Sequence, residues 1–259
     1  PEGSINIASL NKDGERWSSK GAATGVPLNY VAQFSQAMRE NVRGDLTLGG
    51  DWGIDMQANG ASGGAPQLAG MVHVFREKGD LIAGSEVPVV LGLRKLDLRA
   101  DVAGNALRTR VELDGTRAGQ AVVDATVQMV NGRIGTGSPL RLKVNADMAS
   151  MAWLAPLAGQ PGLELDGALK VALTGAGTIG APTLDGIVSG DKLAVRWAEQ
   201  GVKLSDGQLR AQLAGDQLLL QRLSFNGVQG TMLADGFVRF SGGEATAQLK
   251  LVANKLEAL

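Results

Sequence analysis

The stretch Leu96–Val102, with the sequence LDLRADV, decides the fold class because apolar and polar residues alternate along it without a break. The stretch Leu107–Leu113, LRTRVEL, follows the same rule, and so do Leu169–Leu173 and Leu193–Trp197. Successive side chains of a strand point to opposite faces, so strict alternation buries one face and leaves the other in water. The chain is therefore predicted to be all-β.

Turn-forming pairs divide the C-terminal half at intervals of roughly ten residues, as expected of short antiparallel strands joined by hairpins. This spacing predicts a meander, and at about 4.8 Å per strand about twenty strands would span about 100 Å. The pairs are Asp206-Gly207, Gly215-Asp216, Asn226-Gly227, Asp235-Gly236 and Gly242-Gly243.

A first short helix is expected between Asn29 and Val42. The apolar residues Val31, Phe34 and Met38 fall on one helical face there, and Asn29 is a suitable N-cap. This helix would interrupt the alternating pattern near the start of the chain.

A second short helix is expected between Asp147 and Gly159, with Asp147 as its cap. Pro156 is expected to end it, because proline lacks the amide hydrogen that a helix needs. The two helices would then head two copies of one unit.

Two pairs of matching segments support such a repeat. Gly64–Val72, GAPQLAGMV, matches Gly180–Val188, GAPTLDGIV, at six of nine positions. Leu98–Leu107 matches Leu209–Leu218 at six of ten positions, and the order along the chain is kept. Residues 1–259 are interpreted as one continuous segment of a larger protein, built of two approximate repeats at about 28–144 and 145–259.

The composition argues against several classes of function. The 25 Lys and Arg residues balance 26 Asp and Glu, and a net charge of −1 lacks the footprint of nucleic-acid or anionic-membrane binding. Cysteine is absent, which removes disulfides and thiolate metal ligands. The longest apolar run, Val87–Leu93, is much shorter than the roughly 18 residues of a membrane-spanning helix, so we expect a soluble piece of a longer protein.

Residues that look chemical have a simpler structural interpretation. Gly175–Gly180, GAGTIG, fits the dinucleotide pattern G-x-G-x-x-G, but no helix is predicted after it, which favours a β-turn. His73 is the only histidine and lies in a strand-like run. Asp97 and Asp101 share one face of an amphipathic strand, which favours a solvated surface over a cation site. We therefore expect no catalytic residue, metal or cofactor, and no enzyme.

The apolar face of the strands remains as the candidate site. In a closed sandwich it would meet a second sheet, whereas in an open, curved sheet it would line a groove that needs a ligand. Periodicity does not choose between these two cases. The inward residues predicted to form a lipid-binding groove are Leu98, Val102, Val111, Leu113, Leu169, Val171, Leu173, Val195, Leu209, Leu213 and Leu220.

Several turn-and-strand motifs resemble the C-terminal region of the TamB (translocation and assembly module) family, part of the AsmA-like lipid-transfer superfamily. The family's G-x-P-x-L-x-G turn corresponds to Gly180–Gly186, and its AEQG-like element to WAEQGVKLSDGQL at Trp197–Leu209. Arg76–Leu81 and Leu91–Leu93 also look like the family, and the resemblance extends from about Pro27 onward.

The resemblance implies an elongated β-taco, which is a U-shaped open sheet with an apolar trough, interrupted here by the two short helices. It also implies a periplasmic segment of a protein anchored in the inner membrane of a Gram-negative bacterium, with an outer-membrane partner of the Omp85 type. Such proteins are implicated in phospholipid transport to the outer membrane and in outer-membrane biogenesis. The segment is thus expected to hold phospholipid acyl chains and no nucleic acid.

Two other functions stay open at this point. A strand-edge chaperone or scaffold would pair an exposed edge with unfolded outer-membrane β-strands. A closed β-solenoid with a dry core would bind neither lipid nor peptide.

Overall fold

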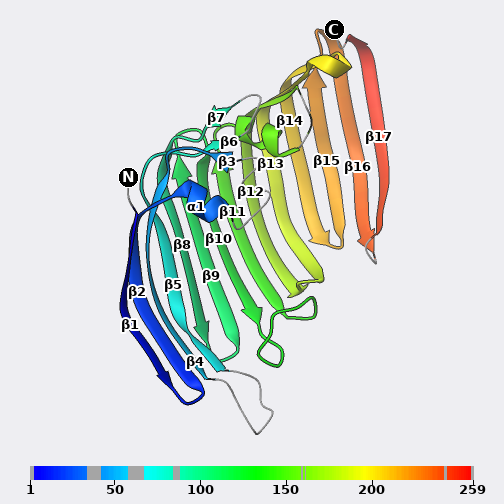
Figure 1. Ribbon diagram of the computed structural model, residues 1–259. Helices are drawn as coiled ribbons and strands as arrows, with labels where there is room; N and C mark the ends of the chain where they lie inside the picture. The colour runs from blue at the N-terminus through cyan, green and yellow to red at the C-terminus, as the bar shows by residue number, and fades with distance from the viewer. Residues whose placement is uncertain are drawn as a thin grey trace.

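The computed structural model describes residues 3–33, 42–57, 67–83, 88–158, 160, 162–241 and 244–257. Within these ranges, fourteen strands pair in chain order into one antiparallel sheet, and three two-residue strands form a small second sheet. Figure 1 shows the large sheet as one continuous, twisted layer from β1 to β17. These two edge strands do not pair with each other in the described part of the chain, so the sheet is open. The predicted all-β, open sheet is confirmed.

The strands of the large sheet are nine to seventeen residues long. They are β1 (Ser4–Asp13), β2 (Arg16–Pro27), β4 (Thr47–Gln57), β5 (Gln67–Lys78), β8 (Leu93–Ala103), β9 (Ala106–Gly115), β10 (Gly119–Gln128), β11 (Leu140–Met148), β12 (Leu163–Thr178), β13 (Ala181–Trp197), β14 (Val202–Gly215), β15 (Gln217–Asn226), β16 (Gln229–Ser241) and β17 (Glu244–Glu257).

The remaining elements are short. The small sheet contains β3 (Val42–Arg43), β6 (Ile82–Ala83) and β7 (Val89–Val90). The helices are α1 (Leu28–Ala32) and the 3-10 helices η1 (Ala152–Ala158) and η2 (Ala198–Gln200). Among the described residues, none of the helices has the length and hydropathy that crossing a bilayer requires.

The strands are fewer and longer than the turn-forming pairs predicted. Gly215-Asp216 and Asn226-Gly227 do separate strands, as expected. Asp206-Gly207 and Asp235-Gly236 lie inside β14 and β16, and Gly242-Gly243 falls outside the described residues. At about 4.8 Å per strand, the fourteen described strands span about 60 Å instead of about 100 Å.

The two residue pairs that were wrongly predicted as turns have other roles within their strands. Asp206 is left-handed, with φ of 49°, and pairing with β15 skips between Ser205 and Gln208, which marks a bulge. Gly236 has φ of 146°, and a Cβ there would lie 2.2 Å from the carbonyl oxygen of Gln248 on β17. Bulges and close backbone approaches need the same residue types as turns, so the pattern alone confuses them.

The first predicted helix is much shorter in the structure. α1 ends at Ala32 and begins directly after β2, so Asn29 lies inside it and the N-cap prediction is wrong. The amide of Leu28, the first helical residue, donates instead to the carbonyl oxygen of Leu46 at 2.9 Å. Phe34 and Met38 lie outside the described residues.

The second predicted helix begins later than expected and is a 3-10 helix. Asp147 belongs to β11 and forms an ion pair with Lys170 on β12 at 3.0 Å, so it is not a helix cap. Pro156 lies within η1 and does not end it. The hydrogen bonding of a short 3-10 helix is less regular than that of an α-helix, so it tolerates the missing amide hydrogen.

The connections at the two ends of the strands differ. At the upper rim, which is the upper end of the sheet in Figure 1, they carry α1, the small sheet, η1 and η2. At the opposite lower rim, the described connections are short turns except for the loop of residues 129–139 after β10. In the described chain, the helices and the small sheet therefore all lie at the upper rim.

The upper-rim elements pack against the sheet and bury a small core. Trp153 of η1 and Val74 of β5 lie against it, although each is only partly buried. The carboxylate of Asp80 ties two of its segments together by accepting the amides of Leu81 and Leu93 at 2.8 and 2.9 Å. The buried cluster is Leu28, Leu46, Leu48, Ala83, Leu91, Leu93 and Ala118.

Two glycines near the starts of β10 and β16 adopt the same unusual backbone conformation. Gly119 on β10 and Gly230 on β16 have φ of 78° and 76°. At both glycines a Cβ would lie within 2.2 Å of a carbonyl oxygen on the next strand, that of Asp147 or Asn254. The two positions share one backbone requirement, while the division of the chain into two repeats stays a prediction.

Candidate functional site

One row of directly opposed residues crosses the whole sheet without a polar side chain. Leu98 on β8 is opposite Val74 on β5 and Val111 on β9, and the pairing continues to both edge strands. Directly opposed residues project from the same face, so the row defines one face of the sheet, called the inner face below. The apolar row is Ile5, Ala23, Gly50, Val74, Leu98, Val111, Val123, Val144, Leu173, Gly186, Leu213, Leu218, Val238 and Ala247.

The inner face is covered only in part. The upper-rim core lies on it, since Leu48, Leu96 and Leu113 project to this face and belong to or contact the buried cluster. No residue of the apolar row is fully buried, and Leu98 is 38% exposed. Within the described residues no second large sheet lies over the row. The arrangement is an apolar surface about 60 Å long that the upper-rim core covers along one margin and at Val74.

All eleven residues of the predicted lipid-binding set project to the inner face. Leu98, Val111, Leu173 and Leu213 belong to the apolar row itself. Ten of the eleven are half-buried and Leu98 is exposed. The rest lie on neighbouring rows of the same face: Val102, Leu113, Leu169, Val171, Val195, Leu209 and Leu220. Their role in binding lipid stays a prediction.

Val195 reaches the inner face only because β13 is irregular. Its strand partners skip between Asp191 and Val195, and Lys192 adopts a left-handed φ of 52°. This bulge shifts the alternation by one residue. Even-numbered positions up to Gly190 point inward before the bulge, and odd-numbered positions such as Leu193 and Val195 point inward after it. A strict period of two across this segment would have placed one end of it on the wrong face.

Several inner-face residues were not predicted from the sequence. Val123 and Val144 lie in the middle of the apolar row. The segment of β10 hides its alternation because Val122, on the opposite face, is also apolar. Gly50 and Gly186 offer no side chain to recognise. The cross-strand register identifies all four, and a single sequence does not contain that register.

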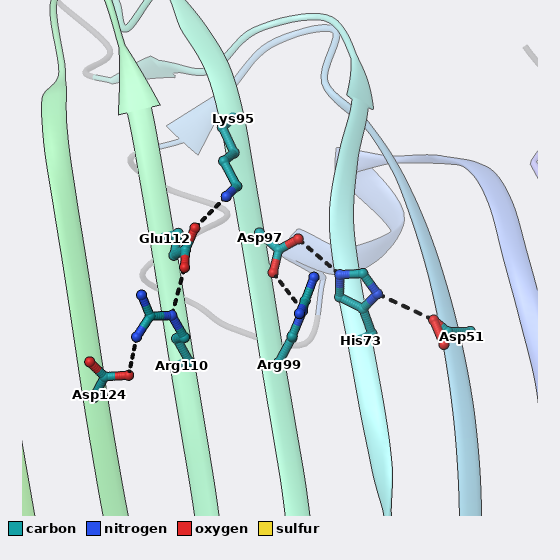
Figure 2. A network of polar contacts seen from close by, with 8 residues as sticks. All are labelled: Asp51, His73, Lys95, Asp97, Arg99, Arg110, Glu112 and Asp124. Carbon is teal, nitrogen blue, oxygen red and sulfur yellow. Dashed lines mark hydrogen bonds and ion pairs between the residues drawn. The ribbon is translucent and has the colours of Figure 1, made fainter.

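The opposite, outer face carries charged side chains that pair across five strands (Figure 2). His73 on β5 lies between two carboxylates, with Nε2 2.9 Å from Asp97 and Nδ1 3.3 Å from Asp51. Asp97 also pairs with Arg99 Nε at 3.1 Å. The sequence predicted a strand-surface histidine, but its partners come from β4 and β8 and depend on the register.

The same network relieves a contact between like charges. Arg99 and Arg110 are directly opposed on β8 and β9, an arrangement that is unfavourable by itself. Arg110 is balanced by Glu112 at 2.6 Å and by Asp124 at 2.8 Å, while Asp97 balances Arg99. Over these five strands the outer face thus carries paired charges, in contrast to the apolar row of the inner face.

Glu112 is the acidic residue of this network whose ionisation changes most. Hydrogen bonds from Lys95 and Arg110 lower the pKa of Glu112 from its ordinary value of 4.5 to about 2. A lowered pKa in the folded chain means that ionised Glu112 stabilises the fold above pH 4.5, and that this contribution is lost as the pH falls towards 2.

We expect Glu112→Gln to lower the urea midpoint of unfolding at neutral pH but to have little effect near pH 2. The reason is that most of the stabilisation by the ionised carboxylate is lost once the pH has fallen to the lowered pKa of Glu112, about 2. Urea titrations of both chains between these limits measure the difference. A difference that stays constant over the whole range would contradict the assigned pairing with Lys95 and Arg110.

A shallow depression of about 660 Å³ lies on the outer face near the N-terminal edge of the sheet. It is lined by residues of β1, β2, β4 and β5, including Lys20, Asp55 and Met71 around Gly53. The carboxylate of Asp55 is already paired with Arg16. The depression is on the side of the sheet opposite the apolar row, so it is not part of the predicted groove.

The remaining motif candidates take ordinary places in the sheet. Gly175–Gly180 forms the end of β12 and its turn into β13, so the β-turn interpretation is confirmed. Asp101 pairs with Arg108 at 3.4 Å. In the described ranges no three His, Asp or Glu side chains gather as metal ligands would. Comparison of the chain with protein-family models, with curated proteins and with solved structures gave no match.

Proposed function

We propose that this chain is a non-enzymatic segment that holds the acyl chains of phospholipids along its inner face. The observation that carries the proposal is the apolar row, which crosses every strand of the described sheet and is not fully buried at any position. A surface of this kind is costly to leave in water, so a greasy ligand would lower the free energy of the whole assembly.

The size of the surface is sufficient for such a ligand. Burial of each methylene group contributes about 0.8 kcal/mol, so a chain of about sixteen carbons gains up to about 12 kcal/mol before ordering costs. The gain is spread over many side chains, because nonspecific burial needs no particular polar contact. A single conservative change such as Leu213→Val would therefore have little effect on binding.

The closed upper margin suggests how the ligand would be oriented. Core residues such as Leu46 and Leu93 occupy the inner face near the upper rim, which leaves the lower rim for polar head groups. Alkyl chains would contact the apolar row, with their heads toward that open margin. Head groups remain hydrated there, which avoids the penalty of burying a charge without a partner.

The proposed cellular role of this lipid-binding segment rests on the resemblance to the TamB family. By that resemblance, the chain would be a U-shaped periplasmic conduit within a longer, inner-membrane-anchored protein. It would take part in phospholipid transport between the two membranes and in outer-membrane biogenesis with an Omp85-type partner. The open sheet and its apolar row are compatible with that role.

We expect phospholipid to co-purify with the chain. Native mass spectrometry of the purified protein, followed by solvent extraction, would detect lipid adducts and identify their head groups. Chain that is free of lipid and also fails to take up an added fluorescent phospholipid would contradict the proposal. That outcome would favour a role in which a protein segment, and not lipid, covers the inner face.

A second candidate function is the pairing of an edge strand with unfolded outer-membrane β-strands. The observation that favours it is that β17 has no second neighbour strand within the described part of the chain, and that its residues Leu249 and Leu251 are exposed. Strand addition uses backbone hydrogen bonds and would bind extended peptides. The test uses a peptide in which apolar and polar residues alternate. Binding of this peptide that added lipid does not displace would support strand pairing over the conduit.

A further inference from the structure

The loop of residues 129–139 is a structured projection at the lower rim, where Figure 1 shows it below the end of β10. The amides of Ile179 and Gly180, in the β12–β13 turn, donate to the carbonyl oxygens of Ser138 and Thr136 at 3.0 and 2.7 Å. Ser138 is almost completely buried, and its hydroxyl accepts the amide of Gly135 at 3.0 Å. The loop and the neighbouring turn therefore form one unit, called the lower-rim tip.

The lower-rim tip exposes apolar side chains to solvent. Val130 and Ile134 of the loop are 49% and 47% exposed, and Ile179 of the adjoining turn is 38% exposed. Val130 and Arg133 bond to each other through both backbone amides, at 2.9 and 3.1 Å, which holds the loop in a tight turn. Apolar side chains held out on an ordered loop can insert into a membrane interface with little loss of chain entropy.

Cations without an ion-pair partner among the described residues lie in the loop and in the first part of β11, which follows it. Residues 125–146 contain Arg133, Arg141 and Lys143 but no acidic residue, although charges balance over the whole chain. All three are exposed. Arg141 is opposite Thr126 on β10, so no carboxylate faces it there. Lys143 is opposite Asp124, but that carboxylate is already bound by Arg110 at 2.8 Å.

We propose that the lower-rim tip docks the protein onto an anionic lipid surface. Exposed apolar side chains combined with nearby cations match such a surface, since the former insert at the interface and the latter bind the head groups. Ile134 would enter the interface while Arg133 and Arg141 contact lipid phosphates. Docking at this rim would place the uncovered margin of the inner face against the membrane.

The test is sedimentation of the full chain with vesicles of phosphatidylcholine, alone or mixed with phosphatidylglycerol. We expect binding to the mixed vesicles only, lost at high ionic strength. Each cation near an anionic surface strengthens binding by about fivefold, so the triple variant Arg133→Ser, Arg141→Ser and Lys143→Ser should bind roughly a hundredfold more weakly.

A matched control removes the same charge elsewhere. Lys203, Arg210 and Arg222 are exposed on β14 and β15, away from the tip, and their triple change to Ser should leave vesicle binding intact. Equal binding to both kinds of vesicle, or equal losses in the two triple variants, would overturn the proposal. So would binding that ignores Ile134→Ser, because a purely electrostatic surface would bind any polyanion.

Docking and acyl-chain binding use different residues, so their failures can be told apart. A variant of the apolar row, such as Leu173→Asp, should lose alkyl binding but retain vesicle binding. The triple variant of the tip should show the opposite result. Loss of both properties in either variant would contradict the separate tip surface.

Discussion

Replacing Leu173 by Asp abolishes alkyl-chain binding by the folded protein, if the inner face holds lipid as proposed. Leu173 lies in the middle of the apolar row, opposite Val144 on β11 and Gly186 on β13. A carboxylate surrounded by acyl chain is disfavoured by about 2.5–3.5 kcal/mol, which corresponds to a loss of affinity of about a hundredfold or more. Titration with a fluorescent phospholipid measures the change directly.

The neighbouring residue supplies a control of identical charge. Ala172 is exposed on the outer face, between Asn145 and Ile187 on the adjacent strands, so Ala172→Asp adds the same carboxylate to the same strand. We expect this variant to bind the fluorescent lipid like the unchanged chain. Circular dichroism would verify that both variants are folded. Equal lipid affinity in the two folded variants would rule out the inner face as the binding surface.

Shortening Leu46 to Ala is expected to lower the free energy of unfolding by about 3 kcal/mol. Leu46 is only 1% exposed and lies in the buried cluster at the upper rim, beside Leu28 and Leu91. Removal of a fully buried isobutyl group loses its transfer free energy and leaves a cavity that the surrounding elements fill only in part. Equilibrium unfolding in urea measures the loss.

The control for Leu46 is a leucine whose side chain is mostly exposed to solvent. Leu10 on β1 is 69% exposed, and Leu10→Ala should change the free energy of unfolding by no more than about 0.5 kcal/mol. Similar losses in the two variants would mean that the upper-rim cluster is not the main core. A large loss for Leu46 alone would identify the covering elements as the part that holds the open sheet in shape.

Alternation was enough to predict which side chains share a face, because a strand has a period of two wherever it is regular. Ten of the eleven predicted groove residues project to the inner face for this reason, while Val195 does so through the bulge in β13. Alternation failed to show how the strands align, which decides that Leu98, Val123 and Leu213 fall on one row. Register comes from pairing between strands and is not written in any one of them.

The turns and helices were harder to predict, because local signals were overruled by contacts made elsewhere. Gly236 looked like part of a turn but allows β16 and β17 to approach closely. Asp147 looked like a helix cap but pairs with Lys170 across two strands. In both cases a residue suited to a turn or cap is used by the sheet instead.

The tip shows a limit of whole-chain composition. A net charge of −1 argued against an anionic membrane surface, yet residues 125–146 carry three cations without an acid. Asp124, the acidic residue just before this segment, is already bound by Arg110 on β9. The net charge of the whole chain therefore does not describe the local charge at the lower rim.

The alternation of connections between the two rims has a consequence for how such a sheet can change. An antiparallel meander returns to the same margin at every second connection, so lengthening the turn at Asn105 or Asp216 adds chain to the lower margin alone. The packing around Leu46 at the other margin would be untouched. Chain that covers the lower margin can thus be added by lengthening these turns, while the packing of the upper-rim core is kept.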